Sequence, residues 1–298
     1  MDLCMKEKNN IGIIGNGFVG SAVAHGFSAA VGYDCHLRVY DKDPKRSSSS
    51  LVEIIDKSDL VFISVPTPSD QRGRINLDIL NKCLEEIYYE ANKNKSFNAI
   101  YLIRSTVVPG TTEDLQNRFK KLKIVFNPEF LTERSAHFDF ISQTRIVLGG
   151  KKEHVDFVKS IYRDRFGNNL SIIETDFKSA ELTKYVCNTF FATKVSFLNE
   201  MKLLSNKIGA NWGDVLEGFL RDGRVGSSHS QVPGPDGKLG FGGSCFPKDI
   251  QALINFGDDI DLNLATLKGA WETNLEVRPE KDWEDLIGRA VLDKEYQE

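Results

Sequence analysis

Ile11-Gly-Ile-Ile-Gly15-Asn-Gly17-Phe-Val-Gly20 is the stretch of sequence that decides the fold. It reads G-x-G-x-x-G, placed directly after an apolar run and at the start of a helical pattern. In this motif Gly15 permits a tight turn, Gly17 lets backbone approach a pyrophosphate, and Gly20 lets the helix pack closely on the strand. Amides at the start of the helix can then hold the anion. The stretch therefore predicts a dinucleotide site on a Rossmann-type sheet.

Asp41 supports this prediction from a second position. It follows the next apolar run, 21 residues after Gly20, where an acid can accept hydrogen bonds from the adenosine ribose hydroxyls. A carboxylate there would repel a 2′-phosphate, so the cofactor predicted is NAD rather than NADP, although the basic Lys45 and Arg46 follow closely. A simpler interpretation is that these glycines serve chain packing alone and bind no dinucleotide. The position of Asp41 argues against that interpretation.

The composition is typical of a folded protein with two domains. The chain has 298 residues, of which 41% are hydrophobic and 27% charged, which is enough for a buried core and too short for three ordinary domains. Its net charge of −4, from 38 basic and 42 acidic residues, lacks the positive excess that nucleic-acid binding requires. We therefore expect no nucleic-acid partner.

Neither a membrane segment nor a secretion signal is evident. No apolar run approaches the roughly 18 residues that a membrane helix needs, and residues 1–10 lack an apolar signal core. We expect no membrane association and a cytoplasmic location. The five cysteines are scattered without a C-x-x-C pair, which favours reduced thiols over a disulfide scaffold or a metal site. They are Cys4, Cys35, Cys83, Cys187 and Cys245.

Apolar runs alternate with helical stretches in the first half of the chain. Short runs of this kind, bounded by Gly, Pro, Asn or Asp, are typical of strands buried on both faces of a parallel sheet. The intervening segments are long enough for crossover helices, so we predict an α/β fold with a doubly wound parallel sheet, an NAD-binding domain over residues 1–175. The predicted strands are 11–14, 37–40, 60–64, 99–103, 123–126 and 145–148.

The second half, residues 176–298, reads as a helical domain for substrate binding and dimerisation. Residues 176–209 contain no Pro, and no Gly before Gly209, with apolar residues at spacings of three, four and seven. They predict one helix, which at about 34 residues would be ~50 Å long. The other predicted segments are helices at 211–221, 248–256 and from about 262, and a Gly/Pro/Ser-rich loop at 223–244.

The apolar stripe of this long helix predicts how it packs. We expect the stripe to be buried against the helix's own domain. Because the helix is longer than a small domain, part of it should extend beyond that domain. We expect this part to pack against the same helix of a second subunit, giving a two-fold homodimer. The stripe comprises Leu182, Val186, Phe190, Phe197, Met201, Leu204 and Ile208.

Two further segments carry pairs of polar residues spaced by four. Asn127-Pro-Glu129-Phe-Leu-Thr-Glu133 predicts a helix start with an N-cap and a proline at the first helical position, so Glu129 and Glu133 should share a face. Lys184 and Asn188 lie on the long helix, away from its stripe. Ordinary interpretations remain open, because first-turn glutamates often complement the helix dipole and a Lys/Asn pair often marks a solvated face.

Gly242-Gly-Ser-Cys245-Phe-Pro247-Lys248-Asp249 places a thiol just before a helix started by a proline. A helix N-terminus and a neighbouring Lys248 both favour the thiolate, and the adjacent glycines leave room for a substrate. Cys187 instead lies within a helix among apolar residues, where desolvation disfavours the charged form. A lone Cys is often buried and inert, yet this setting predicts Cys245 as a nucleophile.

In chain order these motifs resemble the UDP-glucose/GDP-mannose dehydrogenase family. The resemblance extends from about residue 10 to residue 275, and its N-P-E-F-L and cysteine motifs are specific. The segments that carry it are G-N-G-F-V-G (15–20), V-P-T-P (65–68), S-T-V-V-P-G (105–110), N-P-E-F-L-T-E (127–133), E-L-T-K-Y-V-C-N (181–188) and G-F-G-G-S-C-F-P-K-D (240–249).

The resemblance implies an NAD-dependent enzyme that oxidises the primary alcohol of a sugar nucleotide to a carboxylate, for example UDP-glucose to UDP-glucuronate. A thiolate at Cys245 would form a thiohemiacetal with the intermediate aldehyde and then a thioester. Lys184 and Asn188 would stabilise the oxyanion. Asp249 would orient a water or take protons, and Glu133 with Thr106 would activate the water that hydrolyses the thioester.

The resemblance also implies the binding residues. Residues 234–243 would wrap the sugar nucleotide, with substrate contacts from Glu129, Phe130, Leu131, Lys184, Asn188 and Gly242. The implied cofactor contacts are Gly15, Asn16, Gly17, Phe18, Val19, Gly20, Asp41, Arg46, Thr67, Thr106, Glu133 and Lys248.

Members of the family usually carry a third domain, which we expect to be absent from this chain because it stops at Glu298. Two other interpretations are a two-electron 3-hydroxyacid or 6-phosphogluconate-type dehydrogenase and a non-catalytic NAD-binding dimerisation module. The first needs no thiol nucleophile, so Cys245 argues against it. The second does not explain a full catalytic set.

Overall fold

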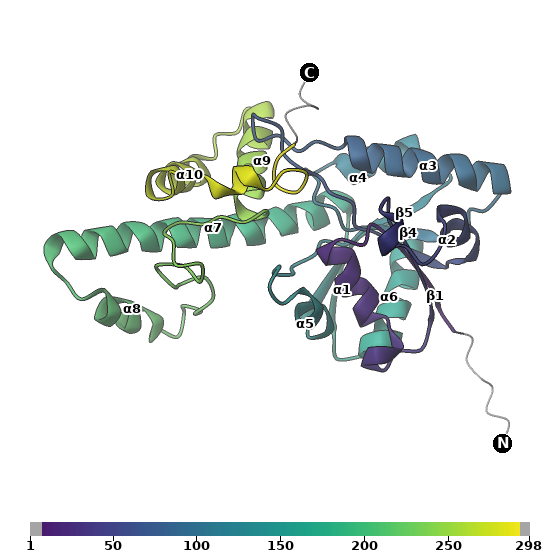
Figure 1. The fold of residues 1–298 in the computed structure, drawn as a ribbon, viewed down its shortest axis with the longest axis horizontal. Helices are drawn as coiled ribbons and strands as arrows, with labels where there is room; N and C mark the ends of the chain where they lie inside the picture. Colours follow the sequence, from purple (N-terminus) through teal and green to yellow (C-terminus); the bar gives the residue numbers. More distant parts are fainter. Residues whose placement is uncertain (1–7, 293–298) are drawn as a thin grey trace. The chain divides into compact units, whose positions relative to one another are not determined.

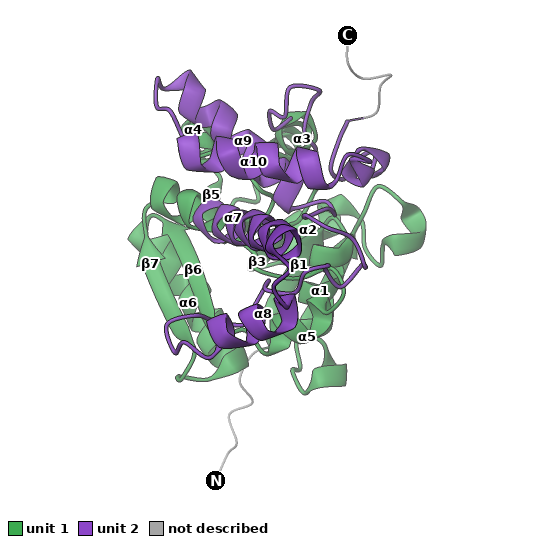
Figure 2. Ribbon diagram, turned by 90° about the vertical axis from the view of Figure 1, so that its left-hand side faces the viewer, with its two compact units in different colours: residues 1–67, 77–184 green, residues 68–76, 185–298 purple. Residues whose placement is uncertain are grey.

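The computed structural model describes residues 8–292. The described chain divides into two compact units, which Figure 2 colours separately. Unit 1 runs to Thr67 and resumes from Leu77 to Lys184. Unit 2 comprises Pro68–Asn76 and the chain from Tyr185 onward. A short excursion from the strand-rich part of the sequence therefore belongs to the helical unit.

Unit 1 is built on a sheet flanked by helices (Figure 1). Within residues 8–292 this sheet has seven strands in the order β2-β1-β3-β4-β5-β6-β7. Neighbouring strands run parallel except for β5 and β6, which pair antiparallel. The predicted α/β fold is confirmed. The strands are β1 (Asn10–Ile14), β2 (His36–Tyr40), β3 (Leu60–Ile63), β4 (Ile100–Ile103), β5 (Lys123–Phe126), β6 (Arg145–Gly150) and β7 (Ser171–Thr175).

The antiparallel β6 and the extra strand β7 differ from the predicted sheet. The side-chain amide of Asn127 donates to the carbonyl of Val147 at 2.9 Å, which holds the chain leaving β5 beside β6. The rest of this connection forms one helix of only six residues, α5 (Ala136–Ile141). The chain then re-enters the sheet with β6 antiparallel to β5.

Helices cover both faces of the sheet, as a doubly wound fold requires. Ile11 and Ile13 point into one core and Ile14 into the other, because successive side chains of a strand alternate. Each fully buried Ile or Phe contributes about 1.5–3 kcal/mol. One core is lined by α1 (Phe18–Gly26), α5 and α6 (Lys152–Phe166), the other by α2 (Leu51–Lys57), α3 (Asp78–Asn94) and α4 (Thr111–Arg118). Short 3-10 turns lie at Ala29–Val31 and Pro44–Arg46.

The carboxyl ends of β1 and β3 form the switch point of the sheet. These strands are neighbours, yet the helix after β1 packs on one face and the helix after β3 packs on the other. Connections that leave in opposite directions open a crevice at this edge, where ligands of such sheets bind. The glycine-rich loop lies at this crevice.

Unit 2 is helical. The long helix α7 (Phe177–Ile208) has 32 residues, starts in unit 1 and continues through unit 2, and it confirms the helix predicted at 176–209. The helices predicted at 211–221, at 248–256 and from about 262 are also present. They are α8 (Trp212–Leu220), α9 (Phe246–Asp259) and α10 (Ala265–Val277), followed by a 3-10 turn at Asp282–Asp285.

Six of the seven stripe residues of α7 are exposed rather than buried against their own domain, so the prediction is wrong for them, and only Met201 of the stripe is half-buried. Val186 is 55% exposed, Phe190 62% and Ile208 70%. The buried face of the helix carries small and polar residues instead, among them Ala192 and Ser196. Small side chains let neighbouring helices approach closely, and Ser196 donates to the carbonyl of Ala270 at 2.6 Å. Buried polar groups with partners of this kind can therefore replace a purely apolar face.

Candidate active site

The glycine-rich loop connects β1 to α1 in unit 1. Gly15 has φ +88°, and a Cβ there would lie 2.7 Å from the Ser64 carbonyl oxygen. A Cβ on Gly20 would lie 1.9 Å from the Gly15 carbonyl oxygen, so close packing of the helix excludes any side chain. A Cβ on Gly17 would meet nothing within 4 Å. The open space at Gly17, beside the first amides of α1, fits the pyrophosphate of a dinucleotide.

Asp41 is fixed beside this loop by backbone hydrogen bonds. Its carboxylate accepts from the amide of Asn16 at 2.6 Å and from the amide of Asp43 at 2.9 Å. The side-chain amide of Asn16 donates to the carbonyl of Arg46 at 2.8 Å, while the Arg46 guanidinium is exposed and lies 3.6 Å from the Asp43 carboxylate. The half-buried acid thus has a fixed position at the end of β2, as ribose binding requires.

Replacing Asp41 with alanine should narrow the preference for NAD over NADP. The substitution removes the charge that would repel a 2′-phosphate and leaves Arg46 nearby to attract it. We expect the ratio of kcat/KM for NAD to that for NADP to fall by about tenfold or more. Steady-state kinetics with both cofactors measure this ratio. Equal use of the two cofactors by the wild type would mean that Asp41 does not face the ribose.

The loops after β3 and β4 are joined at the same edge of the sheet. The hydroxyl of the buried Thr67 donates to the carbonyl of Thr106 at 2.8 Å, and the hydroxyl of Ser105 donates to the carbonyl of Val65 at 2.7 Å. These bonds hold two predicted cofactor-contact residues, Thr67 and Thr106, side by side in unit 1.

The segment after β5 is not a helix, so the predicted helix start at Asn127 is wrong. Residues 127–131 are irregular, and α5 begins only at Ala136. The Asn127 side chain is used inside the protein, where its oxygen accepts from Arg104 at 2.5 Å and from Tyr162 at 2.6 Å. It therefore cannot cap a helix. Glu129 and Glu133 do not share a helical face.

Glu129 and Lys184 form a buried ion pair in unit 1. The Lys184 ammonium donates to the Glu129 carboxylate at 2.5 Å and to the Glu129 carbonyl at 2.6 Å. The side chains are only 4% and 5% exposed. The carboxylate also accepts from the amide of Leu131 at 2.7 Å. Lys184 is therefore held in place by Glu129, whereas Glu133 lies exposed in a turn and Phe130 is half-buried.

In unit 2 the nucleophile candidate Cys245 lies at the N-cap of α9. The residue is half-buried, and its carbonyl accepts the amide of Asp249 at 2.9 Å, the first hydrogen bond of the helix. The helix begins at Phe246, so Pro247 occupies its second position rather than its first. Pro247 fixes backbone geometry at the start of the helix, close to the thiol.

Asp249 is the centre of a buried polar cluster one turn after Cys245. It is 1% exposed and accepts from the Asn188 amide at 2.6 Å and from the Lys248 ammonium at 2.6 Å. Lys248 is buried and paired with Asp249, and its predicted role as a cofactor contact stays a prediction. The cluster joins Asn188 of α7 to the start of α9.

The predicted catalytic residues therefore form two groups, one within each unit. Unit 1 carries Thr106, Glu133 and Lys184 with Glu129, and unit 2 carries Asn188, Cys245 and Asp249. Lys184 and Asn188 are one turn apart on the continuous helix α7. Gly242 and Gly243 precede Cys245, and a Cβ on Gly242 would lie 2.6 Å from the guanidinium of Arg278.

Two other thiols are poorly suited to act as nucleophiles. Burial raises the pKa of the Cys35 thiol to about 11 and that of the Cys83 thiol to about 12. Cys35 also donates to the carbonyl of Phe27. Since the thiolate is the reactive form, both should react slowly near neutral pH. Cys4 lies outside the described residues.

Asn199, Asn274 and Arg278 contact the backbone before Cys245 and were not among the predicted site residues. Asn274 and Arg278 lie four residues apart, a spacing that puts two polar groups on one helical face. That spacing was the available signal.

Within residues 8–292, no three His, Cys, Asp or Glu side chains gather closely enough to bind a metal ion. Among the helices of the same residues, none has the length and apolar character needed to span a bilayer.

Comparisons with known proteins match two segments of the chain to one family. Residues 45–165 match the NAD binding domain of the UDP-glucose/GDP-mannose dehydrogenase family, and residues 178–276 match the central domain of that family. The prediction of NAD as the cofactor is confirmed by the first match. The matches favour neither the two-electron dehydrogenase nor the non-catalytic module.

Individual relatives agree with these matches. A UDP-glucose 6-dehydrogenase of Rickettsia conorii is 36% identical over 225 residues, which cover 74% of this chain and 50% of that protein. The chain thus spans about half the length of the curated relatives it matches. A UDP-glucose dehydrogenase structure from Pyrobaculum islandicum is 29% identical with a TM-score of 0.80, covering 93% of this chain and 70% of that chain. A Mycobacterium tuberculosis 3-hydroxyisobutyrate dehydrogenase, 15% identical with a TM-score of 0.71 over 92% of this chain and 95% of that one, shares the fold alone.

Proposed function

Because this chain belongs to the UDP-glucose/GDP-mannose dehydrogenase family, we propose that it oxidises UDP-glucose at its primary alcohol to UDP-glucuronate, with NAD as the oxidant. The observation that carries this proposal is Cys245 at the N-terminus of α9, one turn before a buried Asp249 bonded to Asn188. A two-electron oxidation of an alcohol needs no thiol. A second oxidation, from aldehyde to acid, gains from a covalent intermediate.

The cofactor would supply the oxidant, one NAD molecule for each of the two oxidations, and the residues proposed to hold it are the glycine-rich loop, Asp41, Thr67 and Thr106. The open space at Gly17 and the fixed carboxylate of Asp41 support this assignment. Arg46 and Glu133 are exposed in unit 1, and both remain proposed cofactor contacts.

Cys245 is proposed to attack the aldehyde carbon as a thiolate. The new C–S bond converts the carbonyl oxygen to the oxyanion of a thiohemiacetal, and oxidation of that adduct leaves a thioester. Water then adds to the thioester, the C–S bond breaks, and the carboxylate leaves while the sulfur regains its proton. Two oxidations and one hydrolysis together convert the alcohol to the acid.

The oxyanion of the adduct needs donors that are already in place. Lys184, held by Glu129, supplies a positive charge, and the Asn188 amide, held by Asp249, supplies an N–H. Donors fixed before the reaction stabilise developing charge without the cost of reorganisation. Asp249 is proposed to accept a proton or orient a water. Glu133 with Thr106 is proposed to activate the hydrolytic water.

NAD reduction with a panel of sugar nucleotides tests the substrate assignment. We expect UDP-glucose to give the highest kcat/KM among UDP-glucose, GDP-mannose and UDP-N-acetylmannosamine. Absorbance at the NADH band reports each rate. Higher turnover of either of the other two substrates would replace UDP-glucose in the proposal, and no turnover of any of them would contradict it.

We further propose that the chain forms a homodimer through α7. The exposed stripe of this helix supports the proposal, because Val186, Phe190 and Ile208 together present an apolar surface of a kind that usually marks an interface. An apolar groove between α7 and α8 continues the stripe. It is lined by Phe197, Leu204, Ile208, Val215 and Phe219 among others.

Replacing Phe190 with arginine should convert the dimer to a monomer. The change puts an unpaired charge into the proposed apolar interface. The free energy of association should become less favourable by about 3 kcal/mol or more. Light scattering should give a mass near 33.5 kDa for the variant and about twice that for the wild type. Tyr89→Arg is the control, because Tyr89 of α3 has a similar exposure, at 67%, but belongs to unit 1 and not to the stripe. A monomeric wild type at high micromolar concentration would contradict the proposal.

A further inference from the structure

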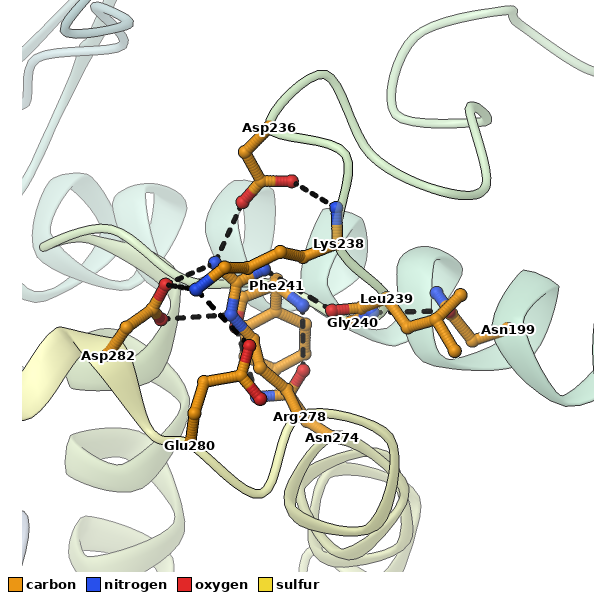
Figure 3. A network of polar contacts seen from close by, with 10 residues as sticks. All are labelled: Asn199, Asp236, Lys238, Leu239, Gly240, Phe241, Asn274, Arg278, Glu280 and Asp282. Carbon is orange, nitrogen blue, oxygen red and sulfur yellow. Dashed lines mark hydrogen bonds and ion pairs between the residues drawn. The ribbon is translucent and has the colours of Figure 1, made fainter.

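Three buried polar side chains of unit 2, those of Asn199, Asn274 and Arg278, hold the loop before Cys245 (Figure 3). We call these three side chains the polar floor of the loop. The amide of Asn274 forms two hydrogen bonds with one residue, accepting from the Phe241 N–H at 2.7 Å and donating to the Phe241 carbonyl at 3.1 Å. The Asn199 oxygen accepts from the Gly240 N–H at 3.1 Å. Asn274 is 0% exposed and Asn199 2%. Two helices, α7 and α10, thus hold consecutive peptide groups of the loop.

Arg278 completes this floor at the end of α10. Its guanidinium donates to the Leu239 carbonyl at 3.2 Å, to Asp236 at 2.7 Å and to both oxygens of Asp282 at 2.9 and 2.6 Å. Arg278 is 2% exposed, and its bonds hold the pKa of Asp282 at about 2. Lys238 adds ion pairs to Asp282 and Glu280 at 2.9 and 3.2 Å. Both ends of residues 236–239 are therefore tied to one buried cation.

The same contacts reach the start of α9 through Phe241. Its ring is 4% exposed and packs edge-on against Phe246, with ring centres 6.1 Å apart. Phe246 is the residue after Cys245. The Arg278 guanidinium also occupies the space beside Gly242, where a Cβ would lie 2.6 Å from it. The floor therefore constrains the chain on both sides of the glycine pair before the nucleophile.

We propose that Asn274 and Arg278 are positioning residues for substrate binding, which hold residues 236–243 in their binding shape before the sugar nucleotide arrives. The proposal rests on the proposed function and on the role that the family resemblance implies for residues 234–243, which is to wrap the sugar nucleotide. The loop contains Gly237, Gly240, Gly242 and Gly243, and glycines lose the most conformational freedom on ordering. A loop ordered in advance spares the substrate that cost, so the residues that order it act on affinity.

Steady-state kinetics of Asn274→Ala and Arg278→Lys test this role. Asn274→Ala removes both bonds to Phe241, and a lysine at 278 cannot reach Leu239, Asp236 and Asp282 together. We expect KM for UDP-glucose to rise about tenfold, with KM for NAD within about twofold of the wild type. Arg74→Ala is the matched control, because it removes an exposed ion pair with Asp259 in the same unit. A fall in kcat with both KM values unchanged would show that these residues do not act on substrate binding, and it would overturn the proposal.

Amide hydrogen exchange provides a second readout that needs no activity. In the free wild type, peptides covering residues 236–243 should be protected, since the Gly240 and Phe241 N–H groups are bonded to buried side chains. Both variants should exchange about tenfold faster there, with no change in peptides of α6. Unchanged exchange in the loop would overturn the proposal. Faster exchange with an unchanged KM for UDP-glucose would overturn the link to substrate binding.

These readouts separate the proposal from the function on which it rests. If none of the tested sugar nucleotides lets the wild type reduce NAD, the proposed function fails. The exchange data still decide whether the floor orders the loop. If Arg278→Lys does not fold, Asp236→Asn takes its place, because that side chain is 35% exposed and only one bond to Arg278 is weakened. The expected rise in KM for UDP-glucose is then about threefold.

Discussion

Replacing Cys245 with serine should lower the rate of sugar-acid release at least about 1,000-fold. A serine hydroxyl is a far weaker nucleophile than a thiolate, and the substitution preserves the N-cap geometry of α9. The variant should therefore still bind substrate and cofactor, and an ester or a bound intermediate should accumulate. Chromatography of the products, with mass spectrometry of the protein, measures both outcomes.

Cys187→Ser is the matched control, because Cys187 is also half-buried but lies within α7. It should keep most turnover. Alkylation by iodoacetamide should modify Cys245 before Cys35 and Cys83, whose pKa values are raised by burial, and saturating UDP-glucose should slow it. Acid release by Cys245→Ser near the wild-type rate would show that the nucleophile is assigned wrongly and favour a two-electron reaction.

Replacing Lys184 with methionine should abolish product formation and lower the free energy of unfolding by about 3–5 kcal/mol. The methionine removes the proposed oxyanion donor. It also leaves the carboxylate of Glu129, 5% exposed, without its cation. Chemical denaturation measures stability, and NADH formation measures activity.

The double variant Lys184→Met/Glu129→Gln separates the two effects. Removing both charges should recover most of the lost stability, because no buried charge is left unpaired, but it should not recover activity. Lys178→Met is the control on the same helix, since Lys178 pairs with Glu113 at the surface with side chains 63% and 49% exposed. That pair should be worth less than about 1 kcal/mol. A loss of stability in Lys184→Met no larger than in this control would contradict the account of the buried pair.

Most of the fold follows from local patterns in the sequence. The predicted strands 11–14 and 37–40 match β1 and β2 to within one residue, because buried parallel strands are short apolar runs with clear boundaries. The strand β7 lacks that pattern. It lies at the edge of the sheet beside β6, and three of its five residues, Ser171, Ile173 and Glu174, are exposed. An edge strand is held by pairing that periodicity does not reveal.

The site was harder to predict where long-range contacts override local preference. Asn127 and the proline after it are favourable for a helix start, but the Asn127 side chain is bound by Arg104 and Tyr162, far away in sequence. The exposed stripe of α7 has a similar cause. Periodicity identifies an apolar face without saying what covers it. Asn274 and Arg278 were missed because each bonds to a loop more than 30 residues earlier in the chain.

The most direct test of the account is the number of NADH molecules formed for each UDP-glucose consumed. The measurement combines absorbance of NADH with chromatography of the sugar nucleotides after complete conversion. If Cys245 carries a thioester between two oxidations, each UDP-glucose should yield two NADH and one UDP-glucuronate, with no free aldehyde. One NADH for each UDP-glucose, with an aldehyde accumulating, would contradict the proposed mechanism.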